Sequence, residues 1–282
     1  QDQVVRIWDA ETGVAIDRYQ GHASPIRGMS FAPNGDLVSI ASEPHAVVWE
    51  TKPTWTLTRT LGTDKSDSVI AGRVTALGFN QDGSLLATGA GIPSRSGQLQ
   101  MWKVADGTLV KEIADAHRDT VFGVAFSPDG AQLASCGADR MVFTFHADSG
   151  KQIRTFEGHT HHVLDVSWRC DGRVLATCGA DNVIKVWNVR TGVQSRSIRG
   201  FDKEVTAVRF VGTSDNVAVC SGDTRVKFKN TEDGKNQADF AGPADFVHAM
   251  DVSADGSIVG AGGHESILWL WNSDGSALTT FK

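Results

Sequence analysis

Residues 158–198 read GHTHHVLDVSWRCDGRVLATCGADNVIKVWNVRTGVQSRSI and decide the fold class of this chain. Four segments of this stretch are rich in β-branched, aromatic and aliphatic residues: Val163–Trp168, Arg173–Cys178, Val183–Asn188 and Val193–Ile198. The breaks between them contain Asp-Gly, Asp-Asn and Thr-Gly, and Gly, Asn and Asp accept the positive φ of tight hairpins. The stretch therefore predicts four short antiparallel strands joined by tight turns.

The same pattern recurs along the chain. Runs of the form apolar-x-x-apolar-x-apolar begin at Ile26, Val74, Val121, Val163, Val205 and Val247, with separations of 48, 47, 42, 42 and 42 residues. An aromatic residue closes each unit, at Trp49, Trp102, Phe145, Trp187, Phe228 and Trp271, and Trp8 precedes Trp49 by 41 residues. Units of this size cannot bury their own faces. They predict an all-β propeller built of four-stranded antiparallel blades.

The residues also carry a family resemblance. Gly158-His159, Ala180-Asp181 and Trp187-Asn188 resemble the signatures of the WD-repeat β-propellers, and Trp8-Asp9 supplies the dipeptide itself. The resemblance extends over essentially the whole chain and implies a seven-bladed propeller that serves as a scaffold for protein binding. More narrowly, the second half resembles WD-repeat modules fused to c-type cytochrome domains in bacteria. No Cys-x-x-Cys-His motif occurs here, so a haem would belong to another segment or chain.

The repeat spacing predicts one domain over residues 1–282, with a half blade at its start. The half blade covers residues 2–20, and complete blades follow at about 22–61, 72–114, 117–156, 159–198, 203–240 and 245–281. Asp2 stands six residues before Trp8, as Asp181 stands before Trp187, so the chain opens in a second-to-third-strand turn. We expect only the outer two strands of the first blade here, with its inner strands on an upstream segment or domain.

The resemblance implies a hydrogen-bond network of Asp, His, Ser or Thr, and Trp in each blade. One blade has the complete set: His159, Thr177, Asp181 and Trp187. A second set replaces Asp by Glu and consists of His22, Ser39, Glu43 and Trp49; a third has Phe145 for Trp and consists of His117, Ser135 and Asp139. Phe201 and Pro243 stand in the His position of the last two blades, which we expect to depend more on packing.

Catalytic and metal-binding interpretations of these residues are less favoured. A Ser/Thr–His–Asp set is also the composition of a hydrolase triad, but here the hydroxyl lies in mid-strand, the set recurs in three blades and no Gly-x-Ser-x-Gly elbow occurs. The cluster His159-Thr160-His161-His162 could ligate zinc, which needs three or four converging ligands, but the network already uses His159. We expect no catalysis, no cofactor and no metal site.

The amino-acid composition limits the classes of partner and the cellular setting that we expect for this chain. With 27 Lys and Arg against 33 Asp and Glu, the net charge of −6 argues against a general nucleic-acid binder. No apolar run approaches the ~18 residues of a membrane span, so we expect a soluble chain without membrane insertion. Cys136, Cys178 and Cys220 are 42 residues apart and indicate buried packing positions. Free thiols fit the cytoplasm, whereas the cytochrome resemblance would place the protein outside it, so the compartment stays open.

Two insertions predict where a partner binds, with tolerated variation in loop length as the alternative interpretation. About 7 extra residues fall within 62–73 and about 4 within 91–98, and both connections open onto the same face in the WD-repeat topology. They predict one protrusion that contains Asp64, Lys65, Asp67, Ile70, Arg73, Ile92 and Arg95. Neighbouring loops add Arg27, Arg118, Phe122, His161, His162, Phe246 and His248, a mixture that suits a protein or peptide contact.

We therefore predict a non-catalytic scaffold for protein–protein interaction. The first alternative is an accessory module that positions an electron-transfer or enzymatic domain encoded upstream or on another chain. The second is a propeller that binds a small molecule in its central channel, which would need converging acids or histidines at the channel mouth. The residues at the starts of the first strands are too apolar and varied for that role: Arg27, Thr75, Phe122, Leu164, Thr206 and His248.

Overall fold

The computed structural model describes residues 3–8, 15–33, 36–50, 56–62, 70 and 72–281, with the backbone alone at 15–17, 50 and 56–57. The chain divides into two compact units. Unit 1 comprises residues 1–139 and 143–153, and unit 2 comprises residues 140–142 and 154–282.

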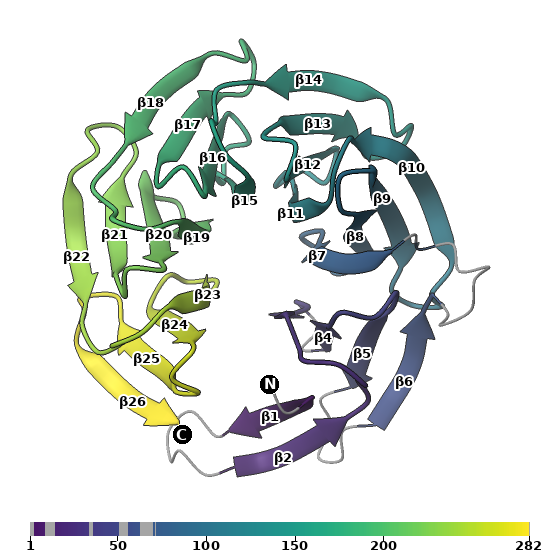
Figure 1. Ribbon diagram of the computed structural model, residues 1–282, viewed down its shortest axis with the longest axis horizontal. Helices are drawn as coiled ribbons and strands as arrows, with labels where there is room; N and C mark the ends of the chain where they lie inside the picture. Colours follow the sequence, from purple (N-terminus) through teal and green to yellow (C-terminus); the bar gives the residue numbers. More distant parts are fainter. Residues whose placement is uncertain are drawn as a thin grey trace. The chain divides into compact units, whose positions relative to one another are not determined.

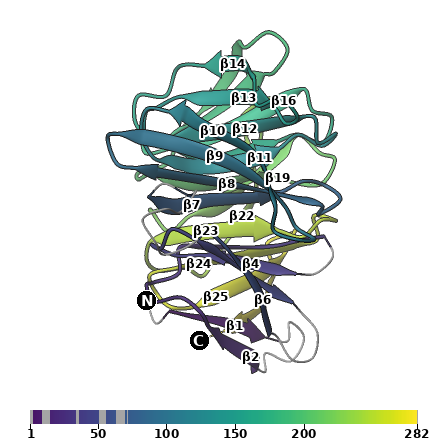
Figure 2. The same ribbon diagram turned by 90° about the vertical axis from the view of Figure 1, so that its right-hand side faces the viewer.

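Unit 1 begins with a two-stranded antiparallel sheet and continues with four-stranded sheets. Its strands are β1 (Val4–Trp8) and β2 (Ala15–Gln20); β3 (Gly28–Phe31), β4 (Leu37–Ile40), β5 (Ala46–Glu50) and β6 (Thr56–Leu61); β7 (Arg73–Phe79), β8 (Leu85–Ile92), β9 (Ser96–Lys103) and β10 (Leu109–His117); and β11 (Val121–Phe126), β12 (Gln132–Gly137) and β13 (Val142–His146). The sheet of β11 to β13 is completed by β14 (Gln152–Phe156), which runs on into unit 2. Figures 1 and 2 show β7 to β10 side by side in chain order.

Unit 2 contains three four-stranded sheets of the same topology. Their strands are β15 (Val163–Trp168), β16 (Val174–Gly179), β17 (Ile184–Asn188) and β18 (Gln194–Ile198); β19 (Val205–Phe210), β20 (Asn216–Ser221), β21 (Val226–Asn230) and β22 (Asn236–Phe240); and β23 (Val247–Val252), β24 (Ile258–Gly263), β25 (Leu268–Asn272) and β26 (Ala277–Phe281). Each sheet is antiparallel throughout, with consecutive strands as neighbours (Figure 1).

The turns of the β15–β18 blade have the backbone geometry that their residues favour. Gly172 between β15 and β16 has a φ of 68°, Asn182 between β16 and β17 has 61°, and Gly192 between β17 and β18 has 76°. Such positive φ values are accessible to Gly and, more readily than for most side chains, to Asn. The four strands lie within one residue of the predicted segments because these turns fix where each strand ends.

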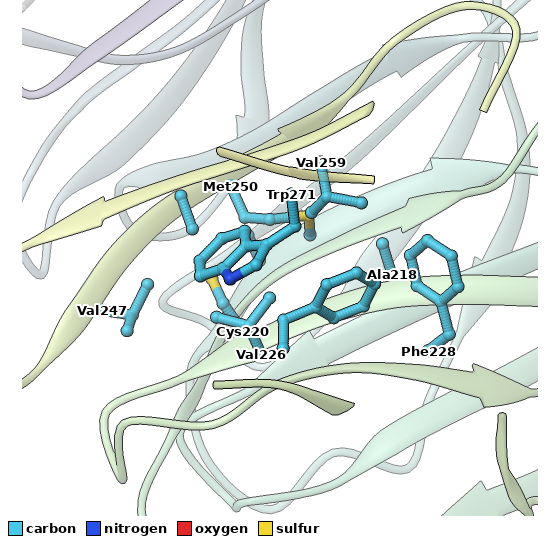
Figure 3. Packing of buried hydrophobic residues seen from close by; sticks show 11 residues of the cluster. Ala218, Cys220, Val226, Phe228, Val247, Met250, Val259 and Trp271 are labelled. Atoms are coloured by element: carbon cyan, nitrogen blue, oxygen red, sulfur yellow. The ribbon is translucent and has the colours of Figure 1, made fainter. Parts of the chain in front are cut away.

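Within each unit, apolar residues of first strands pack on the blade before them. Val74 of β7 is buried against Val38 and Ile40 of β4 in unit 1, and Val205 of β19 is buried against Ala176 of β16 in unit 2. Figure 3 shows the corresponding cluster at the β19–β22 and β23–β26 blades, in which Trp271 lies among labelled residues of both sheets. Blades that cannot bury their own faces are thus stabilised by their neighbours within a unit.

The two-stranded sheet leaves one first strand without this cover. Val5 and Tyr19 of β1 and β2 pack with Leu37, Val47 and Trp49 of the next blade. Met29 and Phe31 of β3 are 53% and 60% exposed, although Phe126 in the equivalent position of β11 is only 8% exposed. Inner strands of the preceding blade cover Phe126, and the sheet of β1 and β2 offers no such strands to Phe31.

The predicted fold class is confirmed: an all-β chain of propeller blades. Within the described residues, six four-stranded sheets accompany one two-stranded sheet, which agrees with the prediction of six complete blades and an incomplete first one. None of the described residues belongs to a helix long and apolar enough to cross a lipid bilayer.

Candidate partner-binding face and the polar networks beneath it

The strand order defines one functional edge in each unit. Because every blade is antiparallel, the turn between its second and third strands and the connection that enters its first strand lie at the same edge of the sheet. We call this edge the loop face of the unit. Of the described residues that the sequence analysis assigned to partner binding, Arg27, Arg95, Arg118, His161, His162 and Phe246 belong to these connections, and Arg73, Ile92, Phe122 and His248 lie at the strand ends beside them.

A polar network lies directly beneath the loop face of the β15–β18 blade. His159 Nδ1 lies 2.9 Å from Asp181 Oδ2, and its Nε2 lies 2.8 Å from the Thr177 hydroxyl. The indole of Trp187 donates to the same hydroxyl at 2.8 Å. Burial alone would raise the pKa of Asp181, but the hydrogen bond from His159 and the backbone N–H of Thr160 outweigh it and lower the pKa. The carboxylate is therefore ionised and accepts three hydrogen bonds.

The β11–β14 blade repeats this arrangement without the indole. His117 lies 3.0 Å from Asp139 Oδ1 and 2.8 Å from the Ser135 hydroxyl, and the ring of Phe143 packs on the imidazole at 4.7 Å between centroids.

The β3–β6 blade has the version with Glu. His22 Nδ1 lies 2.5 Å from Glu43 Oε2, and Ser39 Oγ lies 2.9 Å from both His22 Nε2 and the donating indole of Trp49. The structure thus brings each of the three assigned sets together.

The last two blades use other contacts. Phe201 is buried where the three blades with the network have His, and Pro243 stands at that position in the last blade. There Trp271 donates its indole N–H to the carbonyl of Ala241 at 3.0 Å instead of to a hydroxyl. The ring of Trp269 stacks on Trp271 with 6.0 Å between centroids. Aromatic packing takes the place of the imidazole.

Burial of the hydroxyl groups limits the chemistry of the networks. Ser39, Ser135 and Thr177 each have no solvent-exposed area, and Trp49 and Trp187 donate to Ser39 and Thr177. A triad nucleophile needs access to a carbonyl carbon and an adjacent oxyanion hole. The geometry of these sets suits structural hydrogen bonding.

The predicted protrusion is described in part. Asp64, Lys65 and Asp67 lie outside the described residues. Arg73, Ile92 and Arg95 are exposed at the loop face of unit 1, and Asp119 Oδ1 accepts a hydrogen bond from the Ser94 N–H at 2.8 Å. The β8–β9 hairpin is thereby tied to the loop of the next blade.

One expectation about the protrusion was wrong. Ile70 is only 2% exposed and belongs to the core cluster around Val38, Ile40 and Val74. An isoleucine gains more from burial in this cluster than from exposure on a loop, about 2 kcal/mol for a fully buried side chain. The connection between β6 and β7 is therefore anchored at this residue.

The remaining loop residues fall on the loop faces of both units. In unit 1, Arg27 and Arg118 are exposed and Phe122 is half-buried. In unit 2, His161 is exposed and its ring lies 4.5 Å from that of the half-buried His162.

Phe246 and His248 form an aromatic cluster with a third residue, His264, which the sequence analysis did not name. The centroid distances are 4.8 Å from Phe246 to His248, 4.5 Å from His248 to His264 and 5.7 Å from Phe246 to His264. The Phe246 ring rests on Gly222 of the preceding blade, where a Cβ would collide with it. Both histidines are exposed, so the cluster presents imidazole edges on an anchored ring. The sequence signal for His264 was its position directly after β24, in the turn between the second and third strands of its blade.

The sequence analysis also did not predict an ion pair between the nearly buried Asp165 and the half-buried Arg209. Asp165 of β15 accepts hydrogen bonds from Arg209 of β19, from the Val208 N–H at 2.9 Å and from the Val166 N–H at 2.9 Å. Burial raises the pKa of Asp165, although the Arg209 guanidinium opposes this effect. The sequence feature that could have indicated this ion pair was a single acidic residue inside the largely apolar run Val163–Trp168, with an Arg 44 residues later. The pair links two first strands and offers no open ligand position.

The comparisons with known proteins agree with this architecture. The family model described as "WD domain, G-beta repeat" matches residues 13–50, 58–103, 107–145 and 150–188, which together exceed half of the chain. The nuclear distribution protein PAC1 of Coccidioides posadasii is 32% identical over 166 residues, which cover 57% of this chain and 34% of that protein. WD repeat and SOCS box-containing protein 1 of Homo sapiens is 30% identical over 144 residues, covering 51% and 22%.

Pre-mRNA-processing factor 19 of Oryza sativa subsp. japonica is 29% identical over 145 residues, covering 51% of this chain and 26% of that protein. The chain thus spans about a third or less of the length of these relatives. All three are eukaryotic, so they lend no support to the narrower likeness to bacterial cytochrome-fused modules. Four matched repeats on a scaffold of four-stranded blades show that the chain belongs to the WD-repeat family.

Proposed function

We propose that this protein is a non-catalytic scaffold that binds a partner protein or peptide through its loop faces. The observation that carries the proposal is the contrast between buried and exposed groups. The hydroxyls that could act as nucleophiles are buried in networks, while imidazole rings and guanidinium groups are exposed at the loop faces above them and the rings of Phe122 and Phe246 are half-buried there. Aromatic and Arg side chains dominate the binding energy of many protein interfaces.

The aromatic cluster of Phe246, His248 and His264 is an anchored part of this surface. Its Phe246 ring is held against Gly222, so little conformational entropy is lost when a partner packs on it. The half-buried ring presents an apolar area, and the two imidazoles add hydrogen-bonding edges. A partner with an apolar anchor and neighbouring polar groups fits this chemistry.

The protrusion supplies the second contact region. Arg73, Ile92 and Arg95 place an apolar side chain among cations at the loop face of unit 1. We propose that Asp64, Lys65 and Asp67 extend this region. The WD-repeat relatives carry names from nuclear distribution and pre-mRNA processing, and this spread supports a binding role that is independent of one reaction.

Affinity capture with quantitative mass spectrometry tests the proposal. The wild-type chain is compared with His248→Ala/His264→Ala and with Ile92→Ala/Arg95→Ala. Val193→Ala is the matched control, since Val193 is 63% exposed in the turn between β17 and β18 at the opposite edge. We expect at least one partner to be lost from a loop-face variant and retained by the control. Equal capture by all four chains would refute the loop faces as the binding surface.

A second candidate function is that of an accessory module which positions an electron-transfer domain, such as a c-type cytochrome, or an enzymatic domain. The exposed apolar side chains of Met29 and Phe31 favour it, because inner strands from a linked segment would cover them. The coding sequence upstream of Gln1 separates the candidates. A haem-binding or catalytic segment there supports the accessory role, and its absence removes the version in which the domain is encoded upstream.

A further inference from the structure

Three metal-ligating side chains converge in the β3–β6 blade. The candidate ligand atoms of His22, Glu43 and His45 all lie within 4.8 Å of one another. Glu43 Oε2 lies 2.5 Å from His22 Nδ1 and 3.6 Å from His45 Nε2, so the carboxylate stands between the two imidazoles. The two rings are nearly parallel, with 7° between their planes and 5.9 Å between centroids.

This convergence sets the β3–β6 blade apart from the two blades with the same network. His45 stands four residues before the closing aromatic, a position taken by Met141 before Phe145 and by Val183 before Trp187. Each of the other two networks contains one imidazole and one carboxylate. At the position of His45 they have Met141 and Val183, whose side chains offer no nitrogen ligand. Only the change to His at this position adds a nitrogen ligand.

We propose that His22, Glu43 and His45 bind one divalent first-row transition-metal ion of the Zn²⁺ type. Two imidazoles and one carboxylate are a donor set used for zinc, with a fourth position left for water. Zinc–ligand distances of about 2.0–2.1 Å place tetrahedral ligands roughly 3.3 Å apart. The carboxylate oxygen lies 2.5 and 3.6 Å from the two imidazole nitrogens, which brackets this value. All the candidate ligand atoms lie within 4.8 Å of one another, so side-chain rotations that bring the two imidazoles together by up to about 1.5 Å complete the set.

The surroundings of the cluster support binding. The His22 side chain has no exposed area, which fixes its orientation, while those of Glu43 and His45 are 12% and 10% exposed and leave a path from solvent. Glu43 Oε1 accepts the Ser24 N–H at 2.5 Å, which holds the carboxylate in place.

Coordination through His22 Nδ1 uses the rest of the network as an outer shell. It requires the tautomer with the proton on Nε2, which then donates to Ser39 Oγ at 2.9 Å. The same oxygen accepts the Trp49 indole N–H at 2.9 Å. Partners that orient a ligating imidazole in this way typically contribute roughly 10–100-fold to metal affinity.

Calorimetric titration of the chelator-treated full chain with ZnCl₂ tests the site. His45→Val removes one ligand and introduces the residue present at position 183, so the remaining network keeps its contacts. His45→Gln is a second variant with a polar side chain, and His161→Ala/His162→Ala is the control for zinc binding by loop histidines. Circular dichroism checks that each variant folds.

We expect one equivalent of Zn²⁺ to bind the wild type and the control equally. Both His45 variants should bind at least about 100-fold more weakly, because a ligand matters more than an outer-shell partner. Zn²⁺ should also raise the melting temperature of the wild type and leave that of the His45 variants unchanged. The site is refuted if wild type takes up no Zn²⁺ or if the His45 variants bind it as tightly as wild type.

Discussion

At the scale of single residues, the polar networks show how buried groups are satisfied. His159 uses both ring nitrogens, one on Asp181 and one on Thr177, and Trp187 donates to the same hydroxyl. Each buried polar group of this set of side chains thus has a hydrogen-bond partner in the protein, and such a partner is the condition for burying a polar group at low free-energy cost. The stability of the blade therefore depends on each member of the set.

Asp181→Ala should lower the free energy of unfolding by about 2–3 kcal/mol, because His159 and the Thr160 N–H lose their acceptor. The control is Glu265→Ala in the last blade, where Pro243 replaces the imidazole and Glu265 accepts only backbone N–H groups among the bonds described. We expect a loss of no more than about 1 kcal/mol for the control. Urea denaturation of both variants measures the difference, and equal losses would contradict the assignment.

A turn position shared by four blades offers a second test. Arg140, Asn182, Thr224 and Ser266 are spaced by 42 residues and adopt φ values of 69°, 61°, 72° and 58°. Thr224 is the β-branched member, and a branched Cβ is crowded in the left-handed region. Thr224→Asn should therefore raise the unfolding free energy by about 0.5–1 kcal/mol. Asn182→Thr should lower it by a similar amount; a stabilised Asn182→Thr in thermal unfolding would argue against this reason.

At the scale of elements, polar bonds between first strands supplement the apolar contacts of the blades. The Phe210 N–H donates to the Ser167 hydroxyl at 3.0 Å, and the Thr206 hydroxyl donates to the Val247 carbonyl at 2.8 Å. Asp165 adds an ion pair with Arg209 between β15 and β19. First strands are otherwise joined only by side-chain packing, so such bonds set how one blade is placed on the next.

Asp165→Ala should cost about 2 kcal/mol, since it removes the nearly buried carboxylate that accepts from Arg209 and from the Val208 N–H. Asp251→Ala removes the other acidic neighbour of Arg209, a carboxylate that is 66% exposed and 3.6 Å away, and should cost less than about 1 kcal/mol. Chemical denaturation compares the two. An Asp165 variant as stable as the Asp251 variant would show that the pair contributes little.

At the scale of the whole molecule, the incomplete blade is the main departure from the repeat. Met29 and Phe31 are exposed, whereas the residues at the equivalent positions of the other blades are buried or half-buried, and within the described residues β1 pairs with β2. Exposed apolar side chains on the face of a sheet commonly mark a surface that further chain or a partner covers. We propose that a preceding hairpin completes this blade in the intact protein.

The equivalent residues Phe31 and Phe126 test this proposal. Phe126→Ser should cost about 3–5 kcal/mol, because it empties a packed position between two blades. Phe31→Ser should cost less than about 1 kcal/mol in this chain, since the ring is 60% exposed. In a longer chain that includes the upstream coding sequence, Phe31→Ser should become as costly as Phe126→Ser. An unchanged small cost there would mean that no inner strands cover β3.

The sequence by itself determined the strand pattern, the repeat and the family, because these follow from local turn chemistry and from apolar residues at fixed spacing. The turns at Gly172, Asn182 and Gly192 end the strands of one blade wherever the neighbouring blades lie. Ile70, His45, His264 and Asp165 depend instead on contacts between residues far apart in the chain: a shared core, a second imidazole, an adjoining aromatic ring and an Arg of the next blade. Spacing within one repeat carries no information about which side chains of separate loops or blades meet, so only the tertiary structure decided these.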